Sequence, residues 1–172
     1  MKVKKSSRHS KLTGDFAENL VAYWLSKYGF ECTVVDHTGI DVIAHNPHTK
    51  EVMGISVKSR SRNTGTEYSH MNITNDNFKK VKAACMAFGC SPYFAIVIDA
   101  GNCIYLFILS QNHLLKLHPM GQKTVTWKMS STWVQRYLDD PNIMLVNFEH
   151  ETTRWWDKKK KKEVIKTKAS NK

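Results

Sequence analysis

The pattern of apolar positions predicts a helix near the start of the chain and a second helix at its middle. Between residues 14 and 28, apolar side chains recur every three or four positions, as on one face of a helix: Phe16, Ala17, Leu20, Val21, Trp24, Leu25 and Tyr28. Thr13 is the expected N-cap of this helix, and Gly29 is its expected end. The second helix is predicted over 75–88 and closes at Gly89.

Short apolar runs bounded by turn residues predict strands. Three strands are expected before the second helix and two after it: 31–35, 40–45, 51–58, 92–98 and 102–109. The breakers at 46–50 make the second and third strands an antiparallel hairpin. Four smaller elements follow: a helix at 114–117, a strand at 124–129, a helix at 130–139 and a strand at 143–148. The polar segment 59–72 is expected to be a long loop, either functional or disordered.

This order of elements predicts one α/β domain with a central mixed sheet flanked by helices. A length of 172 residues with 41% hydrophobic residues suits a single domain with a true core. No apolar run approaches the ~20 residues of a membrane span, and the basic N-terminus lacks the apolar stretch of a secretory signal. We therefore expect a cytoplasmic protein without a membrane partner, with reduced core thiols at its four cysteines: Cys32, Cys85, Cys90 and Cys103.

The formal charge of +11 is concentrated at the two ends of the chain. Residues 1–12 carry five basic groups, and residues 151–172 carry nine basic and three acidic groups. The segment 13–150 holds 12 basic and 12 acidic residues and is neutral. We therefore predict a domain over 13–150 between two basic tails. Basic tails usually meet polyanions such as nucleic acid, although they also serve solubility alone.

Four residues in the first third of the chain carry the candidate chemistry: Glu18, Asp41, Ser56 and Lys58. Strand side chains alternate, so Ser56 and Lys58 share one face, and the predicted hairpin places Asp41 beside them. An acid inside an apolar strand needs a partner, because an unpaired buried charge is costly. Taken singly, each residue also fits an ordinary structural role, including an ion pair between Asp41 and Lys58.

The ordered set of short motifs over residues 12–110 resembles the restriction-endonuclease-like superfamily of PD-(D/E)XK nucleases. It looks most like the archaeal Holliday-junction resolvases and related small nucleases. The resemblance rests on these motifs: Gly14-x-x-x-Glu18, Gly29-Phe30, Gly39-Ile40-Asp41-Val42-Ile43-Ala44 and Val57-Lys58. It implies an α-β-β-β-α-β core and a Mg²⁺ ion, or Mn²⁺, held by Asp41, Glu18 and the Val57 carbonyl. Lys58 would then orient or help deprotonate the attacking water.

Ser56 departs from the superfamily pattern, which has Asp, Glu or sometimes Gln two residues before the lysine. Serine removes a negative charge and a direct ligand, although its hydroxyl can hold a metal-bound water. Asp36 and Glu67 are the candidate substitute carboxylates. The expected function is a Mg²⁺-dependent DNA endonuclease. The alternatives are a catalytically impaired nucleic-acid-binding module on the same fold, and a structural subunit that uses its basic tails only for docking.

Two basic segments are expected to contact nucleic acid. Lys58, Arg60 and Arg62 alternate along one strip and can grip phosphates that flank the scissile one. A run of five lysines after Trp155-Trp156 suits a non-specific clamp: Lys158, Lys159, Lys160, Lys161 and Lys162. The expected partner is DNA, duplex or branched, and the resemblance also suggests a homodimer.

Overall fold

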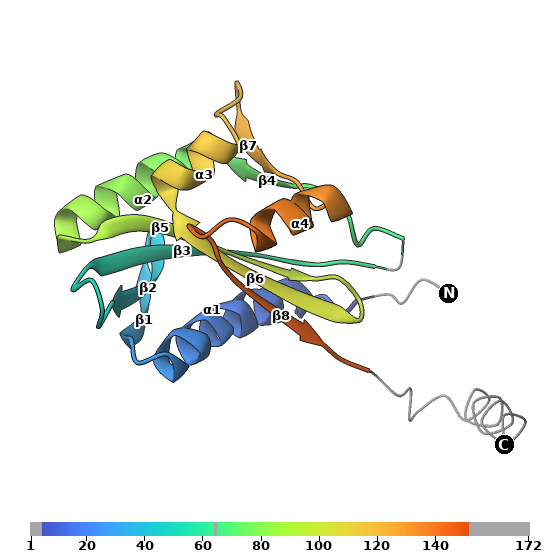
Figure 1. The fold of residues 1–172 in the computed structure, drawn as a ribbon, viewed down its shortest axis with the longest axis horizontal. Helices are drawn as coiled ribbons and strands as arrows, with labels where there is room; N and C mark the ends of the chain where they lie inside the picture. Colours follow the sequence, from blue (N-terminus) through green and yellow to red (C-terminus); the bar gives the residue numbers. More distant parts are fainter. Residues whose placement is uncertain (1–4, 64, 152–172) are drawn as a thin grey trace, which may run out of the picture.

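Six strands form one mixed sheet in the order β1-β2-β3-β5-β6-β8 (Figure 1). The computed structural model describes residues 5–63 and 65–151. The strands of the sheet are β1 (Glu31–His37), β2 (Ile40–His45), β3 (Val52–Ser61), β5 (Ser91–Asp99), β6 (Cys103–Ser110) and β8 (Met144–Glu149). Only β3 and β5 are parallel; the other neighbours are antiparallel. The predicted mixed sheet and the β2–β3 hairpin are thus confirmed.

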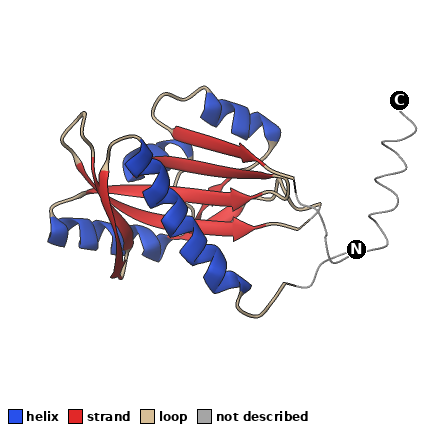
Figure 2. Cartoon of the chain, turned by 90° about the horizontal axis from the view of Figure 1, so that it is seen from below, coloured by secondary structure: helices blue, strands red, loops and turns tan. Residues whose placement is uncertain are grey.

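The sheet separates two apolar cores, because successive strand side chains point to opposite faces. Helix α1 (His9–Lys27) covers one face and packs Ala17, Val21 and Leu25 on it. The other face is covered by α2 (Asn75–Phe88), α3 (Gln111–Leu117) and α4 (Ser131–Leu138). Figures 1 and 2 show α1 crossing the sheet on the side opposite to these three helices. The α-β-β-β-α-β order expected for the core is present in α1, β1, β2, β3, α2 and β5.

A second sheet of two antiparallel strands, β4 (Met71–Thr74) and β7 (Thr124–Trp127), extends the α2 side. Met71 and Ile73 alternate inward and join the same core as Trp127, which is fully buried. The expectation of a loop over 59–72 was therefore wrong at both ends. Its first three residues continue β3, and its last two belong to β4.

The first helix begins at His9 rather than after Thr13. The Thr13 hydroxyl donates to the His9 carbonyl at 2.7 Å, one turn earlier, so Thr13 lies inside the helix and does not cap it. Arg8 occupies the N-cap without a side-chain bond. Residues 9–12, expected in the basic tail, are thus helical, whereas the boundaries predicted for α2 are confirmed.

All four cysteines are free thiols in the structure; Cys85 and Cys103 are buried, whereas Cys32 and Cys90, which were expected in the core, are only partly buried. No helix within residues 5–63 and 65–151 has the length and apolarity to span a membrane. The run of lysines from Lys158 to Lys162, with the tryptophans before it, lies outside the described residues.

Candidate active site

The candidate site lies at a fork between β2 and β3. Their last paired residues in this direction are Val42 and Ile55, and the backbone pairing between the two strands ends there. Asp41 lies on β2 just past the last pair, and its Oδ2 accepts a hydrogen bond from the Val57 backbone N–H at 2.6 Å. The Ser56 hydroxyl donates to the same oxygen at 3.4 Å. A carboxylate thus closes the fork where the ladder of backbone bonds stops.

Lys58 lies on β3 on the same face as Ser56. This face is directed toward α2, because a Cβ added at Gly54 would meet the Cys85 sulfur of that helix. Burial lowers the pKa of Lys58, while the charges of Asp41 and Glu18 partly oppose that shift. Within the described parts of the chain, no carboxylate oxygen lies within 4.0 Å of the Lys58 ammonium. The Lys58 ammonium is therefore attracted by Asp41 and Glu18 but forms no direct ion pair with either of them.

Glu18, on α1, interacts by charge with both Asp41 and Lys58. Burial is the largest cause of its raised pKa, followed by the charges of Asp41, Asp15 and Asp36, with Lys58 acting in the opposite direction. Four carboxylates from α1, β1 and β2 thus act on one region that holds a single half-buried lysine. Burial is therefore the main reason for the raised pKa of Glu18, and each neighbouring acid adds more to it than Lys58 removes.

A tight backbone contact brings α2 close to this region. Gly39, between β1 and β2, has φ +113°, and a Cβ there would lie 2.6 Å from the Lys80 carbonyl oxygen. Only glycine fits this close approach. The charge of Lys80 consequently contributes to the lowered pKa of Lys58, although Lys80 itself pairs with Asp76 at 2.7 Å. Nothing in the sequence pattern singled out Lys80.

The structure brings the predicted site residues together to different degrees. Asp41, Ser56 and Val57 are in direct contact, and Glu18 and Lys58 are coupled to Asp41 by charge. Of the two substitute acids, Asp36 acts on Glu18, as described above. Glu67 instead accepts the Gly65 N–H of its own loop at 2.8 Å. Helical spacing could have found Asp15, which lies one turn before Glu18.

The two predicted phosphate-gripping arginines differ in their surroundings. Arg60 is exposed near the end of β3. Arg62 donates to the Ser69 and His70 carbonyls at 2.9 Å each, so its guanidinium holds the loop that leads to β4. Burial lowers the pKa of Arg62, and its Nε is buried without a partner. The structure therefore gives Arg62 a role within the fold, while Arg60 remains exposed to solvent.

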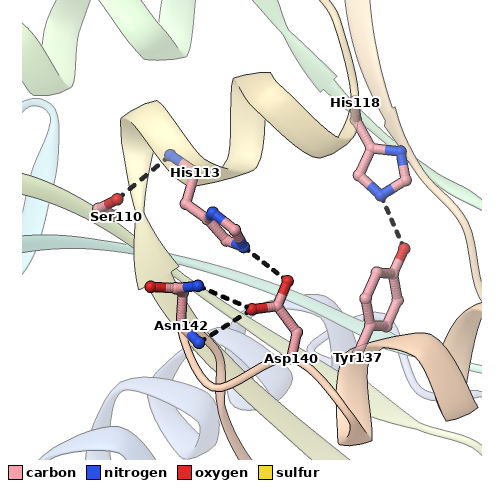
Figure 3. Close-up of polar contacts among 6 residues, drawn as sticks. All are labelled: Ser110, His113, His118, Tyr137, Asp140 and Asn142. Atoms are coloured by element: carbon pink, nitrogen blue, oxygen red, sulfur yellow. Dashed lines mark hydrogen bonds and ion pairs between the residues drawn. The ribbon is translucent and has the colours of Figure 1, made fainter.

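A second polar cluster lies on the α3 side of the molecule (Figure 3). His113 Nε2 and Asp140 Oδ2 are 2.7 Å apart, and Ser110 is close by in sequence and space. The Ser110 hydroxyl, however, accepts from the His113 backbone N–H at 3.2 Å, as an N-cap of α3, and not from the ring. These three residues therefore do not form a Ser-His-Asp nucleophile, which needs the hydroxyl on the imidazole.

The oxygen-bearing side chains at the fork are of the chemical kind that binds Mg²⁺ rather than zinc. In the described part of the chain, no group of three or more His, Cys, Asp or Glu side chains is arranged to hold a metal. Mg²⁺ is often held by only one or two carboxylates, with water and substrate phosphate completing its octahedron. Asp41 and Glu18 are the two carboxylates predicted for such a site, and the Asp41 Oδ1 has no hydrogen-bond partner among the described residues.

Comparison with known proteins identifies the fold. No family model matches the chain, and no curated protein matches its sequence. Among solved structures, the chain is similar to Hjc of Archaeoglobus fulgidus, a Holliday junction resolvase from an archaeal hyperthermophile. The TM-score is 0.52 at 14% sequence identity, and the match covers 71% of this chain and 92% of the resolvase. The chain has the restriction-endonuclease-like fold. The resemblance inferred from the sequence motifs is thereby confirmed for the fold.

Proposed function

We propose that this protein is a metal-dependent DNA endonuclease that hydrolyses phosphodiester bonds at the β2–β3 fork. One observation carries the proposal: Asp41 closes the fork through the Val57 N–H while Glu18 and Lys58 act on it by charge. The shared fold with a Holliday junction resolvase supports DNA as the substrate and branched DNA as a form to test. Since cutting two strands suits two-fold symmetry, a homodimer is part of the proposal.

Asp41 and Glu18, with the Val57 carbonyl, are the groups that would hold the metal. A bound Mg²⁺ or Mn²⁺ would lower the pKa of a water ligand and neutralise charge on the phosphate. Lys58 would offset the charge that develops on the phosphate oxygens. Its lowered pKa also brings the neutral amine, which can accept a proton, closer to neutral pH. The Ser56 hydroxyl orients the Asp41 carboxylate by donating to it.

The proposal is tested by a cleavage assay on duplex, four-way-junction and single-stranded DNA with Mg²⁺ or Mn²⁺. Asp41→Asn and Lys58→Ala should each lower cleavage at least about a hundredfold, because charge stabilisation at such sites is worth ~3 kcal/mol or more. DNA affinity should survive Lys58→Ala, since other basic groups supply most phosphate contacts. Asp139→Asn and Lys116→Ala make the same chemical changes at exposed positions and should leave cleavage unchanged.

A non-catalytic DNA-binding module is the second candidate, and Ser56 favours it. This serine is 1% exposed, so the fork carries a buried hydroxyl where the superfamily pattern has a carboxylate. The module would replace the nuclease if the wild-type protein cuts no DNA with either metal and Asp41→Asn leaves metal response and DNA affinity unchanged. A structural subunit would show no salt-sensitive DNA binding at all.

A further inference from the structure

The N-terminal segment, the start of α1 and the end of β3 line a pocket, and Arg60 in its wall is two residues from Lys58 of the fork. Its volume is about 310 Å³. Three nitrogen-bearing side chains, Lys5, His9 and Arg60, line it together with six serine and threonine hydroxyls. No carboxylate is among the lining residues. A pocket of cations and hydroxyl donors without an acid is complementary to an anion with several acceptor oxygens.

The donors of this pocket are only partly used within the protein. The Lys5 ammonium donates to the Ser61 carbonyl at 2.6 Å and to the Ser61 hydroxyl at 3.0 Å, which leaves its third N–H available. The Ser61 hydroxyl donates in turn to Asp99 at 2.7 Å, so this hydroxyl's own proton is already used. Within the described residues, no acid lies within 4.0 Å of the nitrogens of Lys5, His9 or Arg60. Asp99 is linked to the Lys5 ammonium through the Ser61 hydroxyl, so the charge of Lys5 is partly balanced, whereas no acid pairs directly with the nitrogens of the pocket.

The ring of His9 gives independent evidence that the pocket binds a hydrogen-bonding ligand. Its Nε2 is buried and has no hydrogen-bond partner among residues 5–63 and 65–151. An unpaired buried nitrogen costs free energy that a ligand oxygen or a water would recover. His9 is also the first residue of α1, whose first turn contains no acidic side chain and whose N-cap, Arg8, makes no side-chain cap. The positive end of this helix adds to the attraction for an anion.

The distance between this pocket and Lys58 indicates which anion it would bind. Arg60 follows Lys58 by two residues on β3, so the two positions lie about 6–7 Å apart along the strand. We propose that this pocket binds a backbone phosphate of DNA next to the one held at the fork. The placement of this phosphate beside the scissile one rests on the proposed nuclease function, whereas binding of a DNA phosphate by Lys5, His9 and Arg60 does not.

The test introduces a negative charge into the pocket without harming the helix. Ser10 is exposed, lines the pocket and is the second residue of α1, where an acid is favourable to the helix dipole. Ser10→Asp should therefore fold normally, as checked by circular dichroism. Thr132→Asp is the matched control, because Thr132 is exposed and is the second residue of α4. Lys5→Gln is the second pocket variant and removes a charge instead of adding one.

Binding is measured by fluorescence anisotropy on labelled duplex and junction DNA with Ca²⁺ and with EDTA, so that no cleavage is required. Ser10→Asp and Lys5→Gln should weaken binding about fivefold to tenfold at low salt, and each should lower the slope of log Kd against log salt by about one. Thr132→Asp should stay within about twofold of the wild type. Because this assay needs no cleavage, its outcome is independent of whether the fork is an active nuclease site.

Two results would overturn the inference. The first is equal affinity for Ser10→Asp, Lys5→Gln and Thr132→Asp, which would show that charge in the pocket does not matter. The second comes from titration with inorganic phosphate, followed by NMR of the His9 ring. Tight binding of free phosphate together with unchanged DNA affinity in both pocket variants would assign the pocket to a small anion instead.

Discussion

Ser56→Glu is the sharpest probe of the fork, because it puts back the carboxylate that the superfamily pattern has at this position. Ser56 is almost completely buried, and its hydroxyl lies 3.4 Å from the Asp41 Oδ2. A glutamate there would place a second negative charge beside Asp41, within the field that already raises the pKa of Glu18. The metal-free protein should therefore be destabilised, and a divalent cation should restore it.

The magnitude follows from the distance. Two like charges about 4 Å apart repel by about 4 kcal/mol at an effective dielectric constant of about 20. Binding a proton to the new glutamate at pH 7 would cost about the same, since its ordinary pKa is about 4.3. The free energy of unfolding in EDTA should thus fall by about 3–4 kcal/mol. If the restored site binds Mg²⁺ with a Kd about a hundredfold below the free Mg²⁺ concentration, the ion returns about 2.7 kcal/mol.

Urea unfolding with EDTA and with Mg²⁺ measures these changes, and calorimetric titration gives the metal affinity directly. Ser56→Gln is the matched control, because it has the size and shape of glutamate without its charge. Any cost of fitting the longer side chain appears in both variants, whereas the electrostatic cost and the Mg²⁺ response appear only in Ser56→Glu. Cleavage by Ser56→Glu should equal or exceed that of the wild type.

Equal stability of the two variants in EDTA would show that no repulsion acts at the fork. A loss in Ser56→Glu that neither Mg²⁺ nor Mn²⁺ reverses would show that the carboxylates repel without forming a metal site. Either result would refute the reasoning that makes the fork a metal centre.

Two further predictions concern the α3 side and the C-terminal segment. Burial lowers the pKa of His118 to about 4, so the free energy of unfolding should be full above pH 6.5 and fall by about 3 kcal/mol toward pH 4. His118→Gln, which keeps a donor for the Tyr137 hydroxyl (Figure 3), should lack this part of the pH dependence, and parallel curves would contradict it. Removing residues 157–172 should weaken DNA binding and flatten its salt dependence in anisotropy measurements, because five clustered lysines neutralise several phosphates. Unchanged affinity at low salt would exclude a clamp.

The elements with strong local signals were predictable from the sequence. Helix α2 has a regular apolar face and ends at Gly89, which adopts the left-handed conformation with φ 65°. The hairpin of β2 and β3 follows from the turn residues between them. Alternation along β3 also predicted that Ser56 and Lys58 lie on one face, and the hairpin placed Asp41 beside them.

The remaining elements depend on contacts between distant segments. Strand β4 has only two inward positions, and its partner β7 lies about fifty residues later in the chain. Polar residues continue β3 as far as Ser61 because each is paired in parallel with β5, up to Asp99. The pocket lined by Lys5, His9 and Arg60 depends in the same way on a bond between Lys5 and Ser61, 56 residues apart. No local pattern of hydrophobic and polar positions contains this information.

The fork keeps its geometry without a third acid because Asp41 is held by the backbone. Its bond to the Val57 N–H joins the two strands where their ladder ends, and this bond does not depend on the side chain at position 56. Serine at that position lowers the repulsion in the metal-free protein and still donates to Asp41. The change therefore removes negative charge from the fork and leaves the positions of Asp41 and Lys58 in place. A metal bound there would rely more on the oxygens of the DNA phosphate, which ties its affinity to the presence of DNA.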